Sequence, residues 1–271
     1  MKTRFAPIFL LFACLFLMAF AAPAHGGQTE PIRVLLVTGG HGFKKEPFLD
    51  VFRSFDDVTF RHVVHPKAQA FLRPEALREY DVVVFYDMWQ KIDGQGKKDF
   101  EALLKAGKGV VVLHHAIASY NDWGRYAEII GAKYYLKPQT VNGVEKPKSG
   151  WKHGVDIKVH VVDPQHPVTR GMKDFTIHDE TYKLFDVSED VTPLLTTAEP
   201  TSEKTIGWAR TVENSRLVYL QSGHDHSAYE NPNYRRLVHQ AILWTARRSK
   251  RHTGEADPRH ARPHPGCNAA R

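Results

Sequence analysis

Cysteine is almost absent from this sequence of 271 residues. Cys14 falls in an apolar N-terminal run and Cys267 in a polar C-terminal segment, so the chain between them contains none. This excludes an internal disulfide, a thiolate metal site and a cysteine nucleophile from the body of the protein. A body of roughly 220 residues can still bury a single large core without cross-links.

The body of the protein also lacks net charge. The whole chain carries +7, of which Lys2 and Arg4 contribute +2. From Arg247 to the C-terminus, seven basic residues against two acidic ones contribute +5, which leaves the body between neutral. A nucleic-acid-binding protein needs its basic residues on a folded surface, so no nucleic-acid partner is expected. Residues 248–271, rich in Pro, His and Arg, are predicted to be a disordered basic tail.

The first residues have the pattern of a secretory signal peptide. Two basic residues precede an apolar run over 5–22, and Ala22-Pro23-Ala24 offers a small-residue cleavage site. An uncleaved membrane anchor is the alternative, but the apolar run is a little shorter than the roughly 20 apolar residues that a membrane span needs. We therefore expect residues 1–24 to be removed, with no stable membrane insertion afterwards. The mature protein is predicted to be secreted or periplasmic.

Short apolar runs alternate with amphipathic segments over the first half of the body. Runs rich in Val, Ile and Leu predict buried parallel strands, and apolar residues at every third or fourth position predict helices. This alternation favours an α/β fold with a doubly wound, mostly parallel sheet of the flavodoxin type. The expected strands are 32–37, 58–64, 82–86 and 110–113. One helix is expected to begin near Pro47, and three more are expected at 74–80, 97–106 and 122–130.

The pattern changes after Gly131. Residues 132–190 contain a strand-like run at 155–162 and several polar stretches, and we expect them to form an insertion over the carboxyl edge of the sheet. No internal repeat is present, so residues 31–247 are predicted to form one domain. Three more strands and a closing helix are expected at 192–197, 205–210, 216–220 and 231–246.

Compact metal and phosphate motifs are missing. The sequence has no His-Glu-x-x-His, and TGGHG at 38–42 lacks both the ending of a P-loop and the G-x-G-x-x-G spacing. A nucleotide site is therefore not expected. The glycines, Gly40 among them, instead predict a tight turn at which the backbone approaches a ligand.

Histidine, by contrast, is abundant, with twelve of the 16 residues in the body. Three groups follow predicted strands directly, namely His41, the pair His114 and His115, and His224 with His226. The carboxyl ends of parallel strands meet at one edge, where such sheets bind ligands. Neutral imidazoles there can bind a metal ion, or one can act as a base. The cofactor stays open, with a divalent metal ion on His41, His114 and His224 as the candidate.

A polar stretch at 177–182 adds carboxylates to this picture. If the stretch is extended, Glu180 and Tyr182 share one face and Asp179 points away. His153, beside Trp151, could reach the same pocket from the insertion. The alternative for each group is a structural or solvated role. That structural role is expected for the remaining histidines His62, His65, His160, His166 and His239.

The adjacent histidines at 114 and 115 cannot both face the pocket. Side chains alternate across a strand, so an extended backbone through Leu113 sends the two rings to opposite faces. We expect His114 to be the pocket residue and His115 to support the turn.

Four stretches resemble the ThuA-like (trehalose utilisation) family, in family order over about 31–247. They are VLLVTGGHGF at 34–43, VVVLHHAIASYNDW at 110–123, HPVTRGMKDFTIHDETY at 166–182 and VYLQSGHDHSAYENPNYRRLVHQAILW at 218–244. The resemblance implies a fold like that of the class I glutamine amidotransferases. Those enzymes carry a nucleophilic cysteine where this chain has His114-His115-Ala116, so cysteine-dependent glutamine hydrolysis is excluded.

The resemblance further implies a role in disaccharide or glycoside catabolism, particularly of sugars oxidised at C3. We therefore expect a hydrolase, lyase or isomerase whose partner is a small-molecule carbohydrate. The oligomeric state stays open. Two alternatives are a non-catalytic sugar-binding module, with Trp89, Trp123, Trp151 and Tyr182 stacking on sugar rings, and a metal-dependent amide or ester hydrolase. The candidate catalytic residues are His114, His115, Glu180 and His224, and the candidate substrate-binding residues are Gly40, His41, Trp123, His153 and Tyr182.

Overall fold

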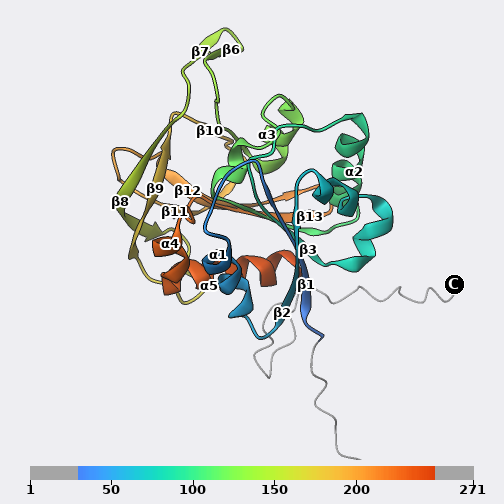
Figure 1. The fold of residues 1–271 in the computed structure, drawn as a ribbon. Helices are drawn as coiled ribbons and strands as arrows, with labels where there is room; N and C mark the ends of the chain where they lie inside the picture. The colour runs from blue at the N-terminus through green and yellow to red at the C-terminus, as the bar shows by residue number, and fades with distance from the viewer. Residues whose placement is uncertain (1–29, 248–271) are drawn as a thin grey trace, which may run out of the picture. The chain divides into compact units, whose positions relative to one another are not determined.

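One sheet of nine strands organises the computed structural model, which describes residues 30–247. The chain divides into two units, Met1–Glu30 and Pro31–Arg271, and the sheet belongs to the second. The strand order is β2-β1-β3-β4-β13-β12-β11-β8-β9 (Figure 1). The predicted signal peptide and basic tail lie outside the described residues, so export and localisation stay predictions.

The first half of the sheet is parallel, as the apolar runs predict. Its central strands are buried on both faces, including every residue of β3 and β4, which explains why they are continuous runs of Val, Leu and Phe. The order β2-β1-β3-β4-β13 confirms a doubly wound, flavodoxin-like arrangement. These strands are β1 (Ile32–Gly39), β2 (Val58–Val64), β3 (Val82–Asp87), β4 (Gly109–Leu113) and β13 (Ser215–Leu220).

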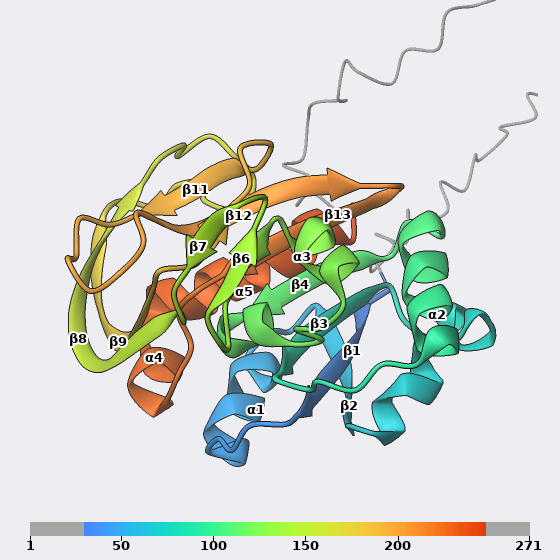
Figure 2. The same cartoon turned by 90° about the horizontal axis from the view of Figure 1, so that it is seen from above.

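Helices cover both faces of this parallel half (Figures 1 and 2). On one face, Phe48 and Phe52 of α1 and Leu237 of α5 belong to one apolar core. On the other, Phe100 of α2 and Ile129 of α3 belong to a second core. The helices are α1 (Lys45–Arg53), α2 (Gly94–Lys105), α3 (Gly124–Ile130), α4 (His226–Glu230) and α5 (Pro232–Thr245), with 3-10 turns η1 (Lys67–Phe71), η2 (Pro74–Glu79) and η3 (His114–Ala118).

From the sequence, we expected the segment 132–190 to lie over the carboxyl edge of the sheet. In the structure, part of this segment instead extends the sheet itself. Its two long strands, β8 (Gly150–Val161) and β9 (Phe175–Lys183), pair with each other, and β8 joins the sheet through β11. The reason is the strict alternation of buried and exposed residues from Val155 to Val161, which gives β8 one apolar face to continue the core. The last residues of β9 nevertheless reach the carboxyl edge of the sheet, where Glu180 and Tyr182 meet His114.

The remaining strands complete an antiparallel second half. β12 (Thr205–Val212) pairs with both β13 and β11 (Thr192–Thr196) in antiparallel fashion. A hairpin of β6 (Gln139–Val141) and β7 (Val144–Lys146) and a short pair of β5 (Ala132–Lys133) with β10 (Asp186–Val187) lie outside the main sheet. Among the described residues, no helix combines the length and apolar character that crossing a membrane requires.

Candidate functional site

His114 lies at the centre of the site, directly after β4. Its backbone takes a left-handed conformation, with φ of 51°, which turns the chain sharply from the strand into η3. The ring is fully buried, and its Nδ1 lies 2.7 Å from the carbonyl oxygen of Gln221. Because a carbonyl can only accept, Nδ1 carries the hydrogen and Nε2 faces the rest of the site.

Glu180 meets three imidazoles at a single oxygen atom. Its Oε2 lies 2.6 Å from Nδ1 of His224, 3.3 Å from Nε2 of His114 and 3.5 Å from Nδ1 of His153. Burial by itself raises the pKa of Glu180, but hydrogen bonding and charge from His114 and His224 outweigh it and lower the pKa to about 2. In turn, the hydrogen bond to Glu180 raises the pKa of His224.

Tyr182 reaches the same centre from β9, two residues after Glu180. Its hydroxyl lies 2.9 Å from Nε2 of His114, and its ring stacks on the His114 ring with centroids 4.9 Å apart. Glu180 and Tyr182 therefore share one face of the strand, as the alternation predicts. Tyr182 is itself buried, so its ring offers no open surface to a sugar.

Asp179 points to the other face of β9, as expected, but it is not a solvated acid. It is buried, and its two oxygens accept the backbone N–H groups of Gly223 at 2.7 Å, His224 at 3.0 Å and Glu180 at 2.9 Å. Asp179 thereby fixes the loop that carries His224 against the strand that carries Glu180. Nothing in the sequence distinguishes it from a surface carboxylate.

The loop after β1 brings His41 to the rim of this cluster. The His41 ring lies 4.5 Å from the His115 ring and 6.4 Å from the His224 ring, measured between centroids. Its Nδ1 lies 2.8 Å from the Gly42 carbonyl oxygen. Burial lowers the pKa of His41, the Gly42 hydrogen bond opposes this, and the neighbouring histidines lower it further.

His115 is buried next to His114, with ring centroids 5.3 Å apart. Its ring packs edge-on against Tyr86, with centroids 4.4 Å apart, and neither ring nitrogen has a hydrogen-bond partner among residues 30–247. Burial, followed by the charge of His114, places the pKa of His115 well below its usual value. Of the pair, His114 contacts Glu180, whereas His115 packs against the rings of Tyr86 and His41.

Of the four aromatic side chains considered for sugar stacking, only Trp151 is open to solvent at the site. It is 58% exposed, and its ring lies 4.5 Å from that of His153, which in turn lies 4.4 Å from that of His224. Trp123 packs instead on Phe100 and Tyr126, and Trp89 stacks on His65.

Gly40 is required for a close backbone approach. It has φ of 81°, and a Cβ at this position would lie 2.5 Å from the carbonyl oxygen of Met88. The approach that the glycines predict is therefore between two loops of the protein. It sets the position of the next residue, His41.

The five histidines for which a structural role is expected bond to groups outside the cluster, which fits that role. Their partners are Thr38 for His62, Tyr120 and Asp87 for His65, Asp174 for His160, the Val168 N–H for His166 and Asp57 for His239.

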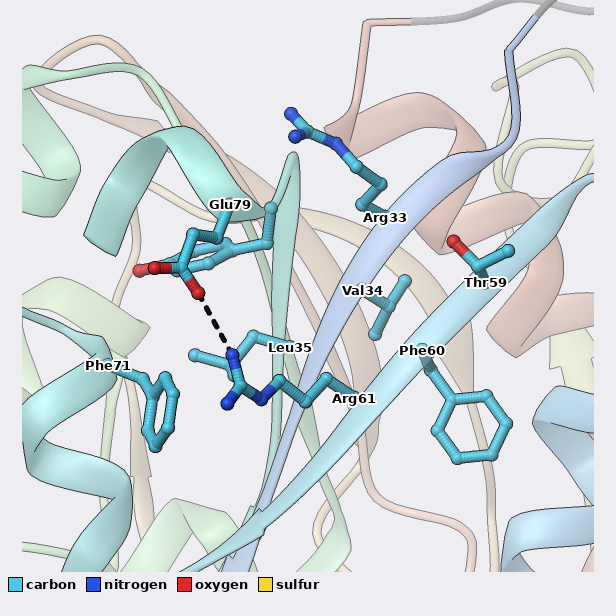
Figure 3. A pocket seen from close by; sticks show the side chains of 9 residues that line it. Arg33, Val34, Leu35, Thr59, Phe60, Arg61, Phe71 and Glu79 are labelled. Atoms are coloured by element: carbon cyan, nitrogen blue, oxygen red, sulfur yellow. Dashed lines mark hydrogen bonds and ion pairs between the residues drawn. The ribbon is translucent and has the colours of Figure 1, made fainter.

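A separate cavity of about 200 Å³ opens between β1, β2 and the 3-10 turns (Figure 3). Its charged groups are already paired, since Arg61 bonds Glu79 at 2.9 Å and Arg33 bonds Asp81 at 2.9 Å. It contains none of the histidines of the cluster. Within residues 30–247, the clustered histidines therefore lie at the carboxyl edge of the sheet and not in this cavity.

One group of side chains in the described part of the chain could hold a metal ion. His114, Glu180 and His224 each offer a ligand atom, and these atoms lie within 4.8 Å of one another. The structure thus groups Glu180, rather than His41, with the two histidines. Buried and partly exposed imidazoles around one carboxylate can also transfer protons and stabilise a developing negative charge.

Solved structures with the same fold include ThuA-like proteins. The chain is 16% identical to one from Parabacteroides merdae, with a TM-score of 0.68 over 84% of this chain and 94% of the other. It is 18% identical to one from Bacteroides uniformis, with a TM-score of 0.59 over 84% and 97% of the two chains. A GMP synthase protein from Thermoplasma acidophilum, 13% identical, gives a TM-score of 0.53 over 81% and 96%.

These similarities, at low identity, establish the fold and agree with the amidotransferase-like arrangement expected from the sequence. Among curated proteins, none matches the chain. The family model described as trehalose utilisation matches residues 33–245, which is nearly all of the described chain. The protein therefore belongs to the ThuA family.

Proposed function

We propose that this protein acts on a keto-glycoside, a carbohydrate oxidised to a ketone at C3, by removing the proton from C2, the carbon between the ketone and the glycosidic carbon C1. The observation that carries the proposal is the position of His41 beside the buried cluster of His114, Glu180 and His224. An accessible base and a centre that can stabilise negative charge are the two parts that this reaction needs. Membership of a trehalose utilisation family supports a sugar as the substrate.

His41 is suited to be the base. Because its Nδ1 faces the Gly42 carbonyl oxygen at 2.8 Å, Nδ1 carries the hydrogen and Nε2 keeps a lone pair. The lowered pKa of His41, caused first by burial, keeps the ring neutral near pH 7 and ready to accept a proton.

The steps of the proposed reaction balance without an outside oxidant. The Nε2 atom of His41 takes the proton from C2 of a 3-keto sugar, and the electron pair moves to the ketone oxygen as an enolate. The enolate then re-forms the ketone and expels the C1 oxygen, which the rim imidazole of His153 protonates. Addition of water to the resulting double bond completes a net hydrolysis. The cluster around Glu180 stabilises the enolate oxygen.

The ordinary mechanism of glycosidases fits this site less well. That mechanism uses two carboxyl groups on opposite sides of the bond, one of them protonated. Here Glu180 has a pKa of about 2 and lies among histidines, and the oxygens of Asp179 are taken up by backbone N–H groups. A reaction begun by an imidazole base next to a ketone uses the residues that are present.

The test is to incubate the purified protein with 3-keto-disaccharides in D2O and to follow both sugar release and exchange at C2 by NMR. We expect both signals with the unaltered protein, loss of both with His41→Ala, and retention with His160→Ala, an exposed control on β8. Absence of exchange and release with every keto-disaccharide tested would contradict the proposal.

A sugar-binding module without turnover is the second candidate, and the exposure of Trp151 favours it. Calorimetry with unmodified disaccharides separates the two functions. Tight binding of the unmodified sugar, with no turnover of its keto form, would support the module instead.

A further inference from the structure

Three potential ligand atoms in the cluster lie close to the distances at which two ligands of the same metal ion lie from each other. The distance from His114 Nε2 to His224 Nδ1 is 3.1 Å, and from His114 Nε2 to Glu180 Oε2 it is 3.3 Å. Two ligands on one ion, with bonds of about 2.0–2.2 Å, lie about 2.8–3.6 Å apart at octahedral or tetrahedral angles. The third distance, 2.6 Å between His224 Nδ1 and Glu180 Oε2, is that of a hydrogen bond that an ion would replace.

The Nε2 atom of His114 presents a lone pair to the centre of this group of atoms. His114 commits its Nδ1 hydrogen to the Gln221 carbonyl oxygen at 2.7 Å, so in the neutral ring Nε2 offers only a lone pair. That lone pair faces the Tyr182 hydroxyl at 2.9 Å, the His224 Nδ1 at 3.1 Å and the Glu180 carboxylate at 3.3 Å. A cation at the common centre would take the lone pairs of His114, His224 and Glu180 as ligands, in place of the protons that Tyr182 and His224 can donate there.

The surroundings of the three atoms are those expected around a metal. A histidine ligand normally donates its other ring N–H to a carbonyl or carboxylate, which fixes the ring and the tautomer. Gln221 does this for His114. Asp179 fixes the backbone of both other ligands, because it accepts the N–H groups of Glu180 and His224.

We propose that His114 Nε2, Glu180 Oε2 and His224 Nδ1 bind one divalent first-row transition-metal ion. Two imidazoles and one carboxylate, without a thiolate, suit ions such as Zn²⁺, Mn²⁺, Fe²⁺ and Co²⁺. His41 is not a ligand in this assignment, which leaves it free as the base.

Three protein ligands leave positions open, which is the mark of a catalytic rather than a structural metal. In the reaction proposed above, and resting on it, the ion would supply the positive charge that stabilises the enolate oxygen. The metal assignment itself depends only on the three ligands and their partners.

Metal binding is tested on the full-length protein, stripped with a chelator and titrated with Zn²⁺ or Co²⁺ against a competing chromophoric chelator. We expect one equivalent bound per chain. Both Glu180→Gln and His224→Ala should weaken the affinity by about 100-fold or more, since each removes a ligand. Circular dichroism of each variant shows whether it remains folded, and the Co²⁺ absorption bands report on the coordination of the ion in each.

Two controls sharpen the result. His160→Ala removes an exposed imidazole far along β8 and should bind metal like the unaltered protein. His41→Ala removes a rim histidine outside the proposed set, whose ring lies 6.4 Å from that of His224 between centroids, and should also bind metal normally. Failure of the unaltered protein to bind one equivalent would overturn the assignment, as would affinity retained in folded Glu180→Gln and His224→Ala, or affinity lost in His41→Ala.

The outcome is separable from that of the proposed function. A protein that binds the ion through these three residues but turns over no keto-glycoside supports the metal site and contradicts the reaction. A protein that loses activity in His41→Ala but binds no metal supports the reaction and contradicts the metal site.

Discussion

Asp179 accepts the backbone N–H of His224 at 3.0 Å while the adjacent Glu180 accepts the His224 side chain at 2.6 Å. Two consecutive residues of β9 therefore bind one histidine of a distant loop, the first through its backbone N–H and the second through its ring. The second oxygen of Asp179 also takes the N–H of Gly223 at 2.7 Å. The backbone of the loop after β13 is thus held to the antiparallel half of the sheet by the buried carboxylate of Asp179.

Asp179→Asn should therefore destabilise the protein and misplace His224. An amide has only one accepting oxygen. Its NH2 group would face backbone N–H groups that, in the unaltered protein, bond to the second carboxylate oxygen. We expect a loss of about 1–3 kcal/mol, the usual effect of buried polar groups left without partners. Urea unfolding measures it, and metal affinity should fall with it.

The control for this variant is Asp156→Asn, on the neighbouring strand. Asp156 pairs with His178 at the surface, where both side chains are more than half exposed. The Asp156→Asn substitution should change the free energy of unfolding by less than about 0.5 kcal/mol. Equal effects of the two substitutions would show that Asp179 has no special positioning role.

His115→Leu should be neutral or stabilising. The ring is buried, and neither nitrogen has a hydrogen-bond partner among residues 30–247, so an apolar side chain of similar volume removes polar atoms without leaving a partner unpaired. Thermal unfolding measures the effect, and both turnover and metal binding should persist. Lost turnover in a folded variant would instead assign His115 a chemical role.

Much of this arrangement could be predicted from particular runs of sequence. The apolar stretch at 110–113 places β4 and the histidines after it, and alternation along β9 places Glu180 and Tyr182 on one face. Long-range pairing could not be predicted. Asp179 finds its partners 44 and 45 residues away, and β8 joins the edge of β11, which local pattern does not specify.

The Arg33–Asp81 pair should make stability depend on acid pH. Burial raises the pKa of Asp81, but its hydrogen bonds with Arg33 and the Arg33 charge outweigh this, so the net pKa is lowered. Because the pKa of Asp81 is lower in the folded state, the pair adds to the free energy of unfolding at pH values above the unfolded-state pKa of about 3.9. This contribution is lost as the pH falls through the folded-state pKa.

The comparison with Asp81→Asn measures this contribution. Because both side chains are partly exposed, the difference in unfolding free energy should stay below about 1 kcal/mol near neutral pH. It should shrink toward zero in acid, below both pKa values. A difference that grows on acidification would have the wrong sign and would refute this role of the pair.

Trp151→Ala should weaken binding of two-ring substrates without affecting the chemistry. The indole is 58% exposed and lies beside His153 at the rim of the cluster, where an aromatic face can stack on the sugar ring beyond the bond that breaks. Loss of such a contact costs about 1 kcal/mol or slightly more, which is roughly a five- to tenfold rise in KM for a keto-disaccharide.

The rise should be absent for a 3-keto methyl glycoside, which has no second ring to stack, and kcat should be unchanged for both substrates. Trp151→Phe should recover part of the affinity because it keeps an aromatic face. Unfolding should be little affected, because the side chain is exposed at the surface. Equal KM changes for the disaccharide and the methyl glycoside would show that Trp151 does not contact the second ring.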